Sequence, residues 1–75
     1  MKIEYDDKFD LLYLRFDDTE QETVNQRVSD YFVLDIGKDD KIVGIEILDA
    51  KEVLNLDSIL PIHYLNNRKE DLVPA

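Results

Sequence analysis

Short stretches in which apolar and polar residues alternate constrain the fold of this chain most, because that alternation is typical of a half-buried β-strand. The stretches are residues 1–5, 11–16, 22–28, 31–36 and 41–48. Turn-forming residues separate them, and the Gly-Lys-Asp-Asp segment before the last stretch is the clearest turn. Stretches joined by short turns pair as antiparallel hairpins. We therefore predict a small antiparallel sheet of four or five strands, arranged as a hairpin meander.

The pattern changes after residue 48 and predicts a short C-terminal helix. Asp49 is followed three residues later by Glu52, which is typical of a capping box at a helix start. Val53 and the apolar residues after it give this helix a side to bury. A second helical stretch is predicted from Ser58, with Pro61 in its first turn, where proline is tolerated.

These elements describe one α+β domain, mostly β, over residues 1–75. Residues 1–50 form the sheet, and residues 51–75 form a helical tail that covers one face of it. A chain of 75 residues buries only about 60% of its unfolded surface, so its core is thin. Because small domains without disulfides or metals gain stability by association, we expect a homo-oligomer, most simply a dimer.

The charge of the chain limits its partners. The sequence has 18 acidic and nine basic residues, a formal net charge of −9. Such a charge repels phosphate backbones and anionic membranes, which argues against nucleic-acid and membrane partners. It suits either solubility alone or docking onto a basic protein partner. No stretch reaches the roughly 18 apolar residues of a membrane span, and residues 1–10 have no apolar signal core. We expect a cytoplasmic protein.

Few residues are available for catalysis or metal binding. The chain has no cysteine and one histidine, His63, so a soft-metal site within one chain is excluded. The aspartate pairs at 6–7, 17–18 and 39–40 fall in predicted turns, where turn formation and solvation explain them. The two glycines leave no phosphate-binding loop, and nothing supports a serine triad with His63. We therefore assign no catalytic residue, no metal ligand and no cofactor, and lean against an enzyme.

Alternation sorts the strand residues into two faces. The first, called the core face below, is almost purely apolar. Its residues are Ile3, Tyr5, Leu12, Leu14, Phe16, Phe32, Leu34, Ile36, Val43, Ile45 and Ile47. The second, called the mixed face below, combines charged, aromatic and aliphatic side chains. Its residues are Glu4, Tyr13, Arg15, Tyr31, Val33, Asp35, Ile42, Gly44, Glu46 and Leu48.

The mixed face holds the candidate functional residues, which are Glu46, Asp35, Arg15, Glu4, Tyr13 and Tyr31. Three interpretations of them stay open. One is cross-strand pairing of charges on a solvated face, with Arg15 as the main cation. Another is a half-buried dimer interface, since tyrosine, arginine and aliphatic residues are typical of interfaces. The third is a site in which Glu4, Asp35 and Glu46 converge on a cation such as Mg²⁺.

Gly44 lies between Ile42 and Glu46 on the mixed face and has no side chain. In a strand, a glycine indicates that another group approaches the backbone closely.

Two motifs carry a family resemblance. Residues 5–13 read Y-D-x-x-x-D-x-L-Y, and residues 42–50 read I-V-G-I-E-I-L-D-A after the Val-Leu-Asp of residues 33–35. Together they resemble the domain of unknown function family 2283, a family of short bacterial and archaeal proteins, over about residues 1–50. The resemblance implies a small antiparallel sheet with a short helix, and it implies no known activity.

The resemblance extends to single residues. Asp10, Asp35 and Glu46 match residues that are typical of the family. One departure is Asp40, where the family often has a glycine in the turn.

We expect a non-enzymatic protein-interaction module that uses its acidic surface and its mixed face. The sequence leaves open a small enzyme, or a Mg²⁺- or Ca²⁺-binding protein, that uses the carboxylates of the mixed face. Some relatives are thought to lie beside toxin-like genes, so the resemblance also implies a narrower alternative, an antitoxin-like partner of a basic toxin.

Overall fold

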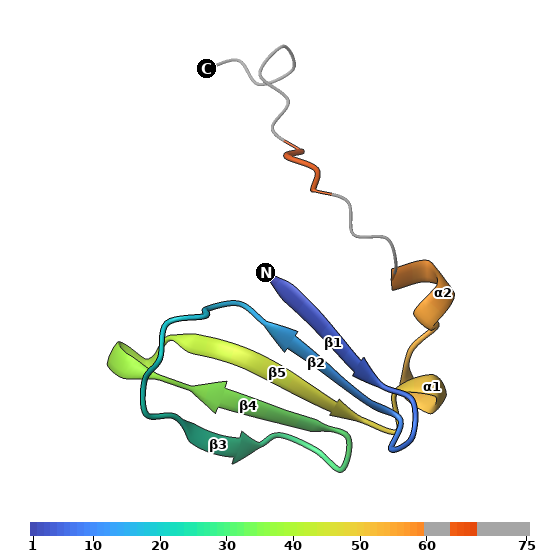
Figure 1. The fold of residues 1–75 in the computed structure, drawn as a ribbon, viewed down its shortest axis with the longest axis horizontal. Helices are drawn as coiled ribbons and strands as arrows, with labels where there is room; N and C mark the ends of the chain where they lie inside the picture. Colours follow the sequence, from blue (N-terminus) through green and yellow to red (C-terminus); the bar gives the residue numbers. More distant parts are fainter. Residues whose placement is uncertain (60–63, 68–75) are drawn as a thin grey trace.

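The computed structural model describes residues 1–59 and 64–67 of the chain. One sheet is formed by the strands β1 (Lys2–Asp6), β2 (Leu11–Arg15), β3 (Val24–Arg27), β4 (Phe32–Ile36) and β5 (Ile42–Leu48). The 3-10 turn η1 (Lys38–Asp40) precedes β5, and the helices α1 (Ala50–Val53) and α2 (Leu56–Ile59) follow it (Figure 1). The predicted fold class, α+β and mostly β with an antiparallel sheet, is confirmed. Neither helix of this described part is long and apolar enough to cross a membrane.

The strand order differs from the predicted meander at one connection. The order is β1-β2-β5-β4-β3, so β5 lies between β2 and β4, and β2 and β3 are not neighbours (Figure 1). The physical reason is burial. β5 is the longest and most apolar strand, with sequence IVGIEIL, whereas all residues of β3 are exposed. A central strand is covered on both edges, so the sheet places its most apolar strand in the middle and its most polar strand at an edge.

The core forms where the helices meet the core face. Tyr5 pairs with Leu12, Leu12 pairs with Ile47, and Ile47 pairs with Phe32, so these side chains form one row across four strands. Leu12, Ile47 and Ala50 are the buried centre of this cluster, and Leu12 is only 1% exposed. Apolar side chains of α1 and α2 pack against it, which confirms that the C-terminal helices cover the core face.

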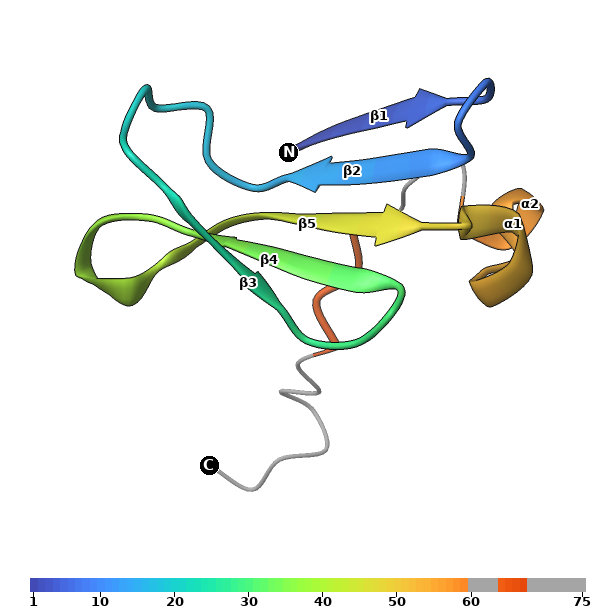
Figure 2. The same cartoon turned by 90° about the horizontal axis from the view of Figure 1, so that it is seen from below.

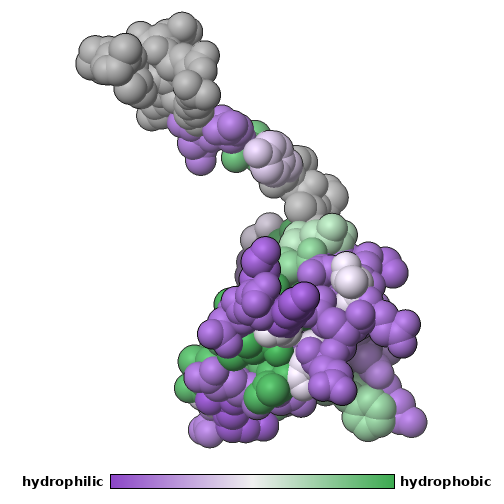
Figure 3. Space-filling model, turned by 90° about the vertical axis from the view of Figure 1, so that its left-hand side faces the viewer, coloured by the Kyte–Doolittle hydropathy of each residue, from purple (hydrophilic) through white to green (hydrophobic). Residues whose placement is uncertain are grey.

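The helices cover only one end of that face. Figure 2 shows both of them at the end of the sheet where β5 finishes. At the opposite end the apolar side chains Phe16, Val24 and Ile42 are exposed. Figure 3 views the molecule from that opposite end and shows apolar patches among hydrophilic ones.

A register shift between β4 and β5 corrects the predicted faces. Uniform pairing would place Ile36 opposite Val43, but Ile36 pairs with Ile42 and the ladder is irregular at Asp35 and Ile36. The extra residue on β5 moves Ile42 to the core face, where it is 44% exposed, and Val43 to the lining of the mixed face, where it is buried. The assignments of Ile42 and Val43 were therefore wrong, because alternation cannot reveal a bulge.

The start of α1 was predicted correctly, but its cap was not. Asp49 makes no side-chain cap and adopts a left-handed backbone, with φ 51°. Asp10, from the β1–β2 turn, caps the helix instead: its main-chain oxygen accepts from the amide of Ala50 at 3.0 Å, and its two carboxylate oxygens accept from the amide of Lys51 at 3.1 Å. Asp10 Oδ1 also accepts a hydrogen bond from the Tyr5 hydroxyl at 2.8 Å. One carboxylate thus ties β1, the first turn and α1 together.

The second helix begins earlier than predicted. α2 starts at Leu56 rather than Ser58, and Leu56 and Ile59 pack against the core cluster. The amide of Ser58 donates to the Asn55 carbonyl at 3.0 Å, so the turn is already formed before the predicted start. The rest of that predicted stretch, with Pro61 and His63, lies outside the described residues.

Candidate functional site

The mixed face carries a cavity of about 600 Å³. Strand residues form its floor, namely Glu4, Leu11, Tyr13, Arg15, Asp35, Val43 and Glu46. Five of the six predicted site residues therefore meet here. Tyr31, the sixth, lies just before β4, is 36% exposed and does not line the cavity.

Tyr13 is held in one position at the centre of the floor. Its hydroxyl donates to Asp35 Oδ2 at 2.6 Å, which joins β2 to β4 across the intervening β5. The phenol passes over Gly44: a Cβ there would overlap the Tyr13 hydroxyl, approach Tyr13 Cζ to 2.6 Å and approach the carbonyl oxygen of Leu14 to 2.8 Å. The predicted close approach at Gly44 is thus confirmed, and the approaching group is the Tyr13 ring.

Two tyrosines of the fold are locked as hydrogen-bond donors. Burial, followed by the hydrogen bond to Asp35, raises the pKa of Tyr13 to about 12. The hydrogen bond to Asp10, followed by burial, raises the pKa of Tyr5 to about 12. Neither phenol is therefore suited to act as a base near neutral pH, and both bonds persist there.

We expect the stability of the protein to fall between pH 10 and pH 12, where an unfolded tyrosine loses its proton while Tyr5 and Tyr13 keep theirs. The sign follows because the folded chain binds more protons in this range, so the free energy of unfolding decreases as pH rises. Thermal midpoints measured across this range should fall less steeply in Tyr13→Phe and Tyr5→Phe than in the wild type. Equal slopes in all three proteins would contradict the raised pKa values of Tyr5 and Tyr13.

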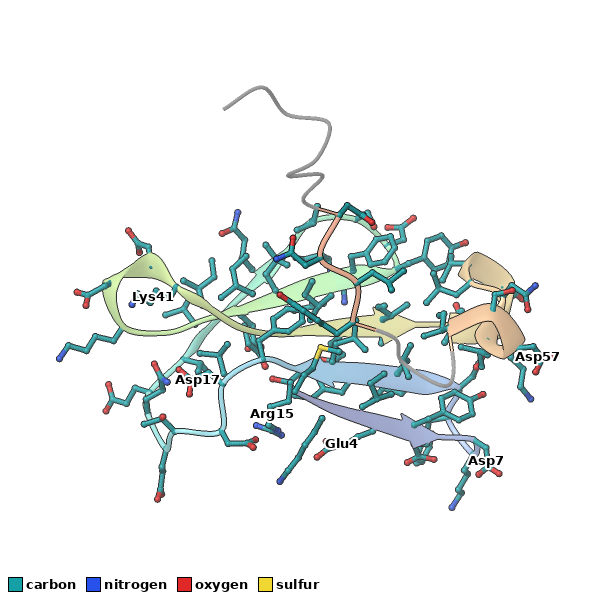
Figure 4. The ribbon with its side chains drawn as sticks, turned by 90° about the horizontal axis from the view of Figure 1, so that it is seen from above. Glu4, Asp7, Arg15, Asp17, Lys41 and Asp57 are labelled. Atoms are coloured by element: carbon teal, nitrogen blue, oxygen red, sulfur yellow. The ribbon has the colours of Figure 1, made fainter. Side chains whose placement is uncertain are left out.

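Among the described residues that line the cavity, Arg15 is the one cation, and it already has partners. Its guanidinium lies over the Tyr13 ring, 4.8 Å from the ring centre. It also pairs with Glu4 at 3.7 Å and with Asp18 at 3.7 Å. Figure 4 shows Arg15 and Glu4 next to each other on β2 and β1. Arg15 therefore neutralises part of the cavity wall and does not pair with Glu46.

Glu46 has a different environment from the other charged residues of the floor. It lies on β5 opposite Tyr13 on one side and Val33 on the other, and it is half-buried. Within residues 1–59 and 64–67, no hydrogen bond or ion pair joins its carboxylate to another residue. Arg15 makes its cross-strand charge pair with Glu4 rather than with Glu46, and the Glu46 carboxylate faces the cavity without a partner in that described part.

The carboxylates of the mixed face do not form a ready metal site. In the described ranges, no three acidic or histidine side chains are placed so that they could hold a metal ion. Asp35 is bound to Tyr13 and Glu4 to Arg15, so Glu4, Asp35 and Glu46 line the same cavity without converging on one point.

The loop between β2 and β3 forms the rim of the cavity, which sequence reasoning missed. Residues 18–21 and Thr23 line it. Gln21 fixes this loop, because its side chain donates to Asp17 at 3.3 Å and accepts from the amide of Lys38 at 3.0 Å. The amide of Thr19 also donates to Asp17 and, as the main cause, lowers the pKa of that carboxyl. The length of this polar segment was the available signal, because a tight hairpin needs only a few loop residues.

Comparison with known proteins identifies the family of the chain and nothing more specific. The family described as protein of unknown function, DUF2283, matches residues 2–51, in agreement with the resemblance seen in the motifs. No curated protein and no solved structure shows a significant match.

Proposed function

Since the chain belongs to the DUF2283 family of proteins of unknown function, we propose its role from the geometry of the mixed face: a non-enzymatic protein-interaction module that binds a basic segment of a partner protein. The cavity receives a lysine or arginine side chain of that partner, and Glu46 pairs with it. The observation that carries the proposal is the half-buried Glu46 carboxylate, which has no hydrogen bond or ion pair within the described residues.

Charge supports a cationic partner. Of the residues that the structure describes, five with carboxylates line the cavity, namely Glu4, Asp18, Glu20, Asp35 and Glu46, against the single guanidinium of Arg15. The whole chain has a net charge of −9, so long-range attraction also favours a basic protein and speeds its encounter.

The rigidity of the floor supports recognition rather than chemistry. Tyr13 is fixed by Asp35, by the Arg15 guanidinium and by the backbone at Gly44. A preorganised floor lowers the entropy cost of binding. The narrower proposal, an antitoxin-like role, corresponds to a basic toxin as the partner.

Replacing Glu46 by glutamine is expected to weaken partner binding at least about tenfold, because the partner's cation would lose its opposite charge in a half-buried site. The partner is first captured from the native host with the tagged wild-type chain and identified. Its purified form is then titrated calorimetrically with the wild type, with Glu46→Gln and with Glu52→Gln.

Glu52 is the matched control, because it is an exposed carboxylate on α1 and its replacement changes the net charge equally. Loss of affinity in Glu46→Gln but not in Glu52→Gln supports the proposal. Equal losses of affinity in both variants would mean that the net charge alone causes the effect. Unchanged affinity in both variants would exclude Glu46 as the binding residue.

A further inference from the structure

The edge strand β3 is the most exposed of the five strands of the sheet. All four of its residues are exposed, and among the strands of the described residues only β4 borders it. Val24 is 69% exposed, and Val28, which follows the strand, is 59% exposed. Edge strands of monomeric proteins are commonly protected by lysine or proline, and residues 22–30 contain neither. This edge is therefore open to pairing with another strand.

The backbone shows which groups of β3 point outward. The amide of Val28 donates to the carbonyl of Phe32 on the β4 side at 2.9 Å. Because hydrogen-bonding direction alternates along a strand, Val24, Gln26 and Val28 bond towards β4. The amides and carbonyls of Asn25 and Arg27 consequently point away from the sheet, towards the open edge.

We propose that a second copy of this chain pairs antiparallel with β3, about a two-fold axis at Gln26. In this register Asn25 lies opposite Arg27 of the second copy, and the two positions exchange backbone hydrogen bonds in both halves of the interface. The two five-stranded sheets join into one continuous sheet.

The side chains of β3 select this register. An antiparallel pair must bring side chains of the same face together. With the axis at Gln26, Val24 lies opposite Val28 of the second copy on the core face, so both exposed valines gain an apolar neighbour. Gln26 lies opposite its own copy, and one amide can donate while the other accepts. The register with the axis at Asn25 would instead place each Val24 opposite a glutamine.

Charge also favours a second copy at this edge. Two chains of net charge −9 repel each other, but within residues 24–28 the only charged side chain is Arg27. The guanidinium of Arg27 donates to the carbonyls of Ser29 and Asp30 in its own chain. The contact is therefore made along an edge strand that carries no carboxylate of its own, whereas β1 carries Glu4 and Asp6.

The other edge of the sheet, β1, is less suited to this contact. Its apolar residues Ile3 and Tyr5 pack against the core of their own chain. Its charged residues Lys2 and Glu4 form ion pairs with Asp18 and Arg15. β1 thus lacks the exposed apolar side chains that β3 offers.

The test is the mass of the full chain by sedimentation equilibrium, up to about 1 mM because short edges give weak dimers. The wild type should dimerise reversibly. Asn25→Pro should weaken dimerisation at least about tenfold, since proline removes an outward amide but no hydrogen bond to β4. Phe9→Ser, which removes an apolar side chain that is 68% exposed in the β1–β2 turn, should leave dimerisation unchanged.

A pair of double variants tests the register. Val24→Lys/Val28→Lys sets like charges opposite each other and should abolish the dimer. Val24→Lys/Val28→Glu sets opposite charges there and should restore it. Circular dichroism confirms that each variant is folded. A wild type that stays monomeric, or a dimer that Asn25→Pro does not weaken, would overturn the proposal, and a failure of the charge exchange to restore the dimer would overturn the register.

Discussion

Gly44→Ala is expected to lower the free energy of unfolding by about 2–3 kcal/mol, because overpacking a buried position forces its neighbours to move. A Cβ at this position meets the Tyr13 ring and, at 2.8 Å, the carbonyl oxygen of Leu14. The ring is held by Asp35, and the carbonyl belongs to the adjacent strand, so neither yields easily. Since a chain of this size has a total stability of about 4–11 kcal/mol, the loss is a large fraction of it. Urea denaturation measures it.

Two controls separate the contributions at Gly44. In a Tyr13→Ala background the ring is absent, so Gly44→Ala should cost less there than in the wild type, while the contact with the Leu14 carbonyl remains. Gly37→Ala should cost less than Gly44→Ala, because its Cβ meets the side chains of Gln21 and Val43 rather than backbone. A loss at Gly44 no larger than that at Gly37 would contradict the close packing of Tyr13 over β5.

Asp10→Ala is expected to lower the free energy of unfolding by about 2–3 kcal/mol. Its carboxylate caps α1 and accepts from Tyr5, and loss of a cap alone costs about 1 kcal/mol. Asp10 also has a φ of 53°, and alanine is less stable than aspartate in that left-handed region by a similar order, about 1 kcal/mol. Thermal or urea unfolding measures the change.

Asp10→Asn is the matched variant, because asparagine tolerates a positive φ and its amide oxygen can still accept hydrogen bonds. We expect it to retain most of the stability. If Asp10→Asn were as damaging as Asp10→Ala, charge rather than the cap geometry would be responsible. If neither variant lost stability, Asp10 would not hold α1 to the sheet.

The family motifs therefore have mostly structural explanations in this chain. Tyr5, Asp10 and Ala50 join the first hairpin to α1, and Ala50 is completely buried. Tyr13, Asp35 and Gly44 form one contact across three strands. Of the three family-typical carboxylates, Asp10, Asp35 and Glu46, only Glu46 takes part in neither contact.

The strands could be predicted from the sequence because alternation is a local signal. All five were located within two residues of their ends, and the core residues Leu12 and Ile47 were assigned to the correct face. The turn before β5 was also predicted. Its Asp39 and Asp40 adopt φ 59° and 58°, a conformation that aspartate tolerates and glycine adopts easily, so Asp40 fits a turn position for which the family resemblance led us to expect glycine.

The rest depended on contacts between distant parts of the chain. The insertion of β5 between β2 and β4 reflects competition among strands for the central position, which depends on how apolar the strands are relative to one another and not on the alternation within any one of them. The cap of α1 comes from Asp10, which lies 41 residues before Lys51, so the nearer Asp49 was the natural but wrong choice. The bulge near Val43 and the rim formed by residues 18–21 are likewise features that alternation within a strand does not reveal.

We propose that the motif residues around Asp10 and Gly44 hold the fold, whereas Glu46 is reserved for a partner. The most direct test is the free energy of unfolding of Glu46→Gln, measured by urea denaturation beside Asp10→Ala and Gly44→Ala. We predict that Glu46→Gln stays within about 0.5 kcal/mol of the wild type, as a side chain without partners among residues 1–59 and 64–67 should. A loss of about 2 kcal/mol or more, similar to that of the other two variants, would make Glu46 a structural residue and contradict the claim.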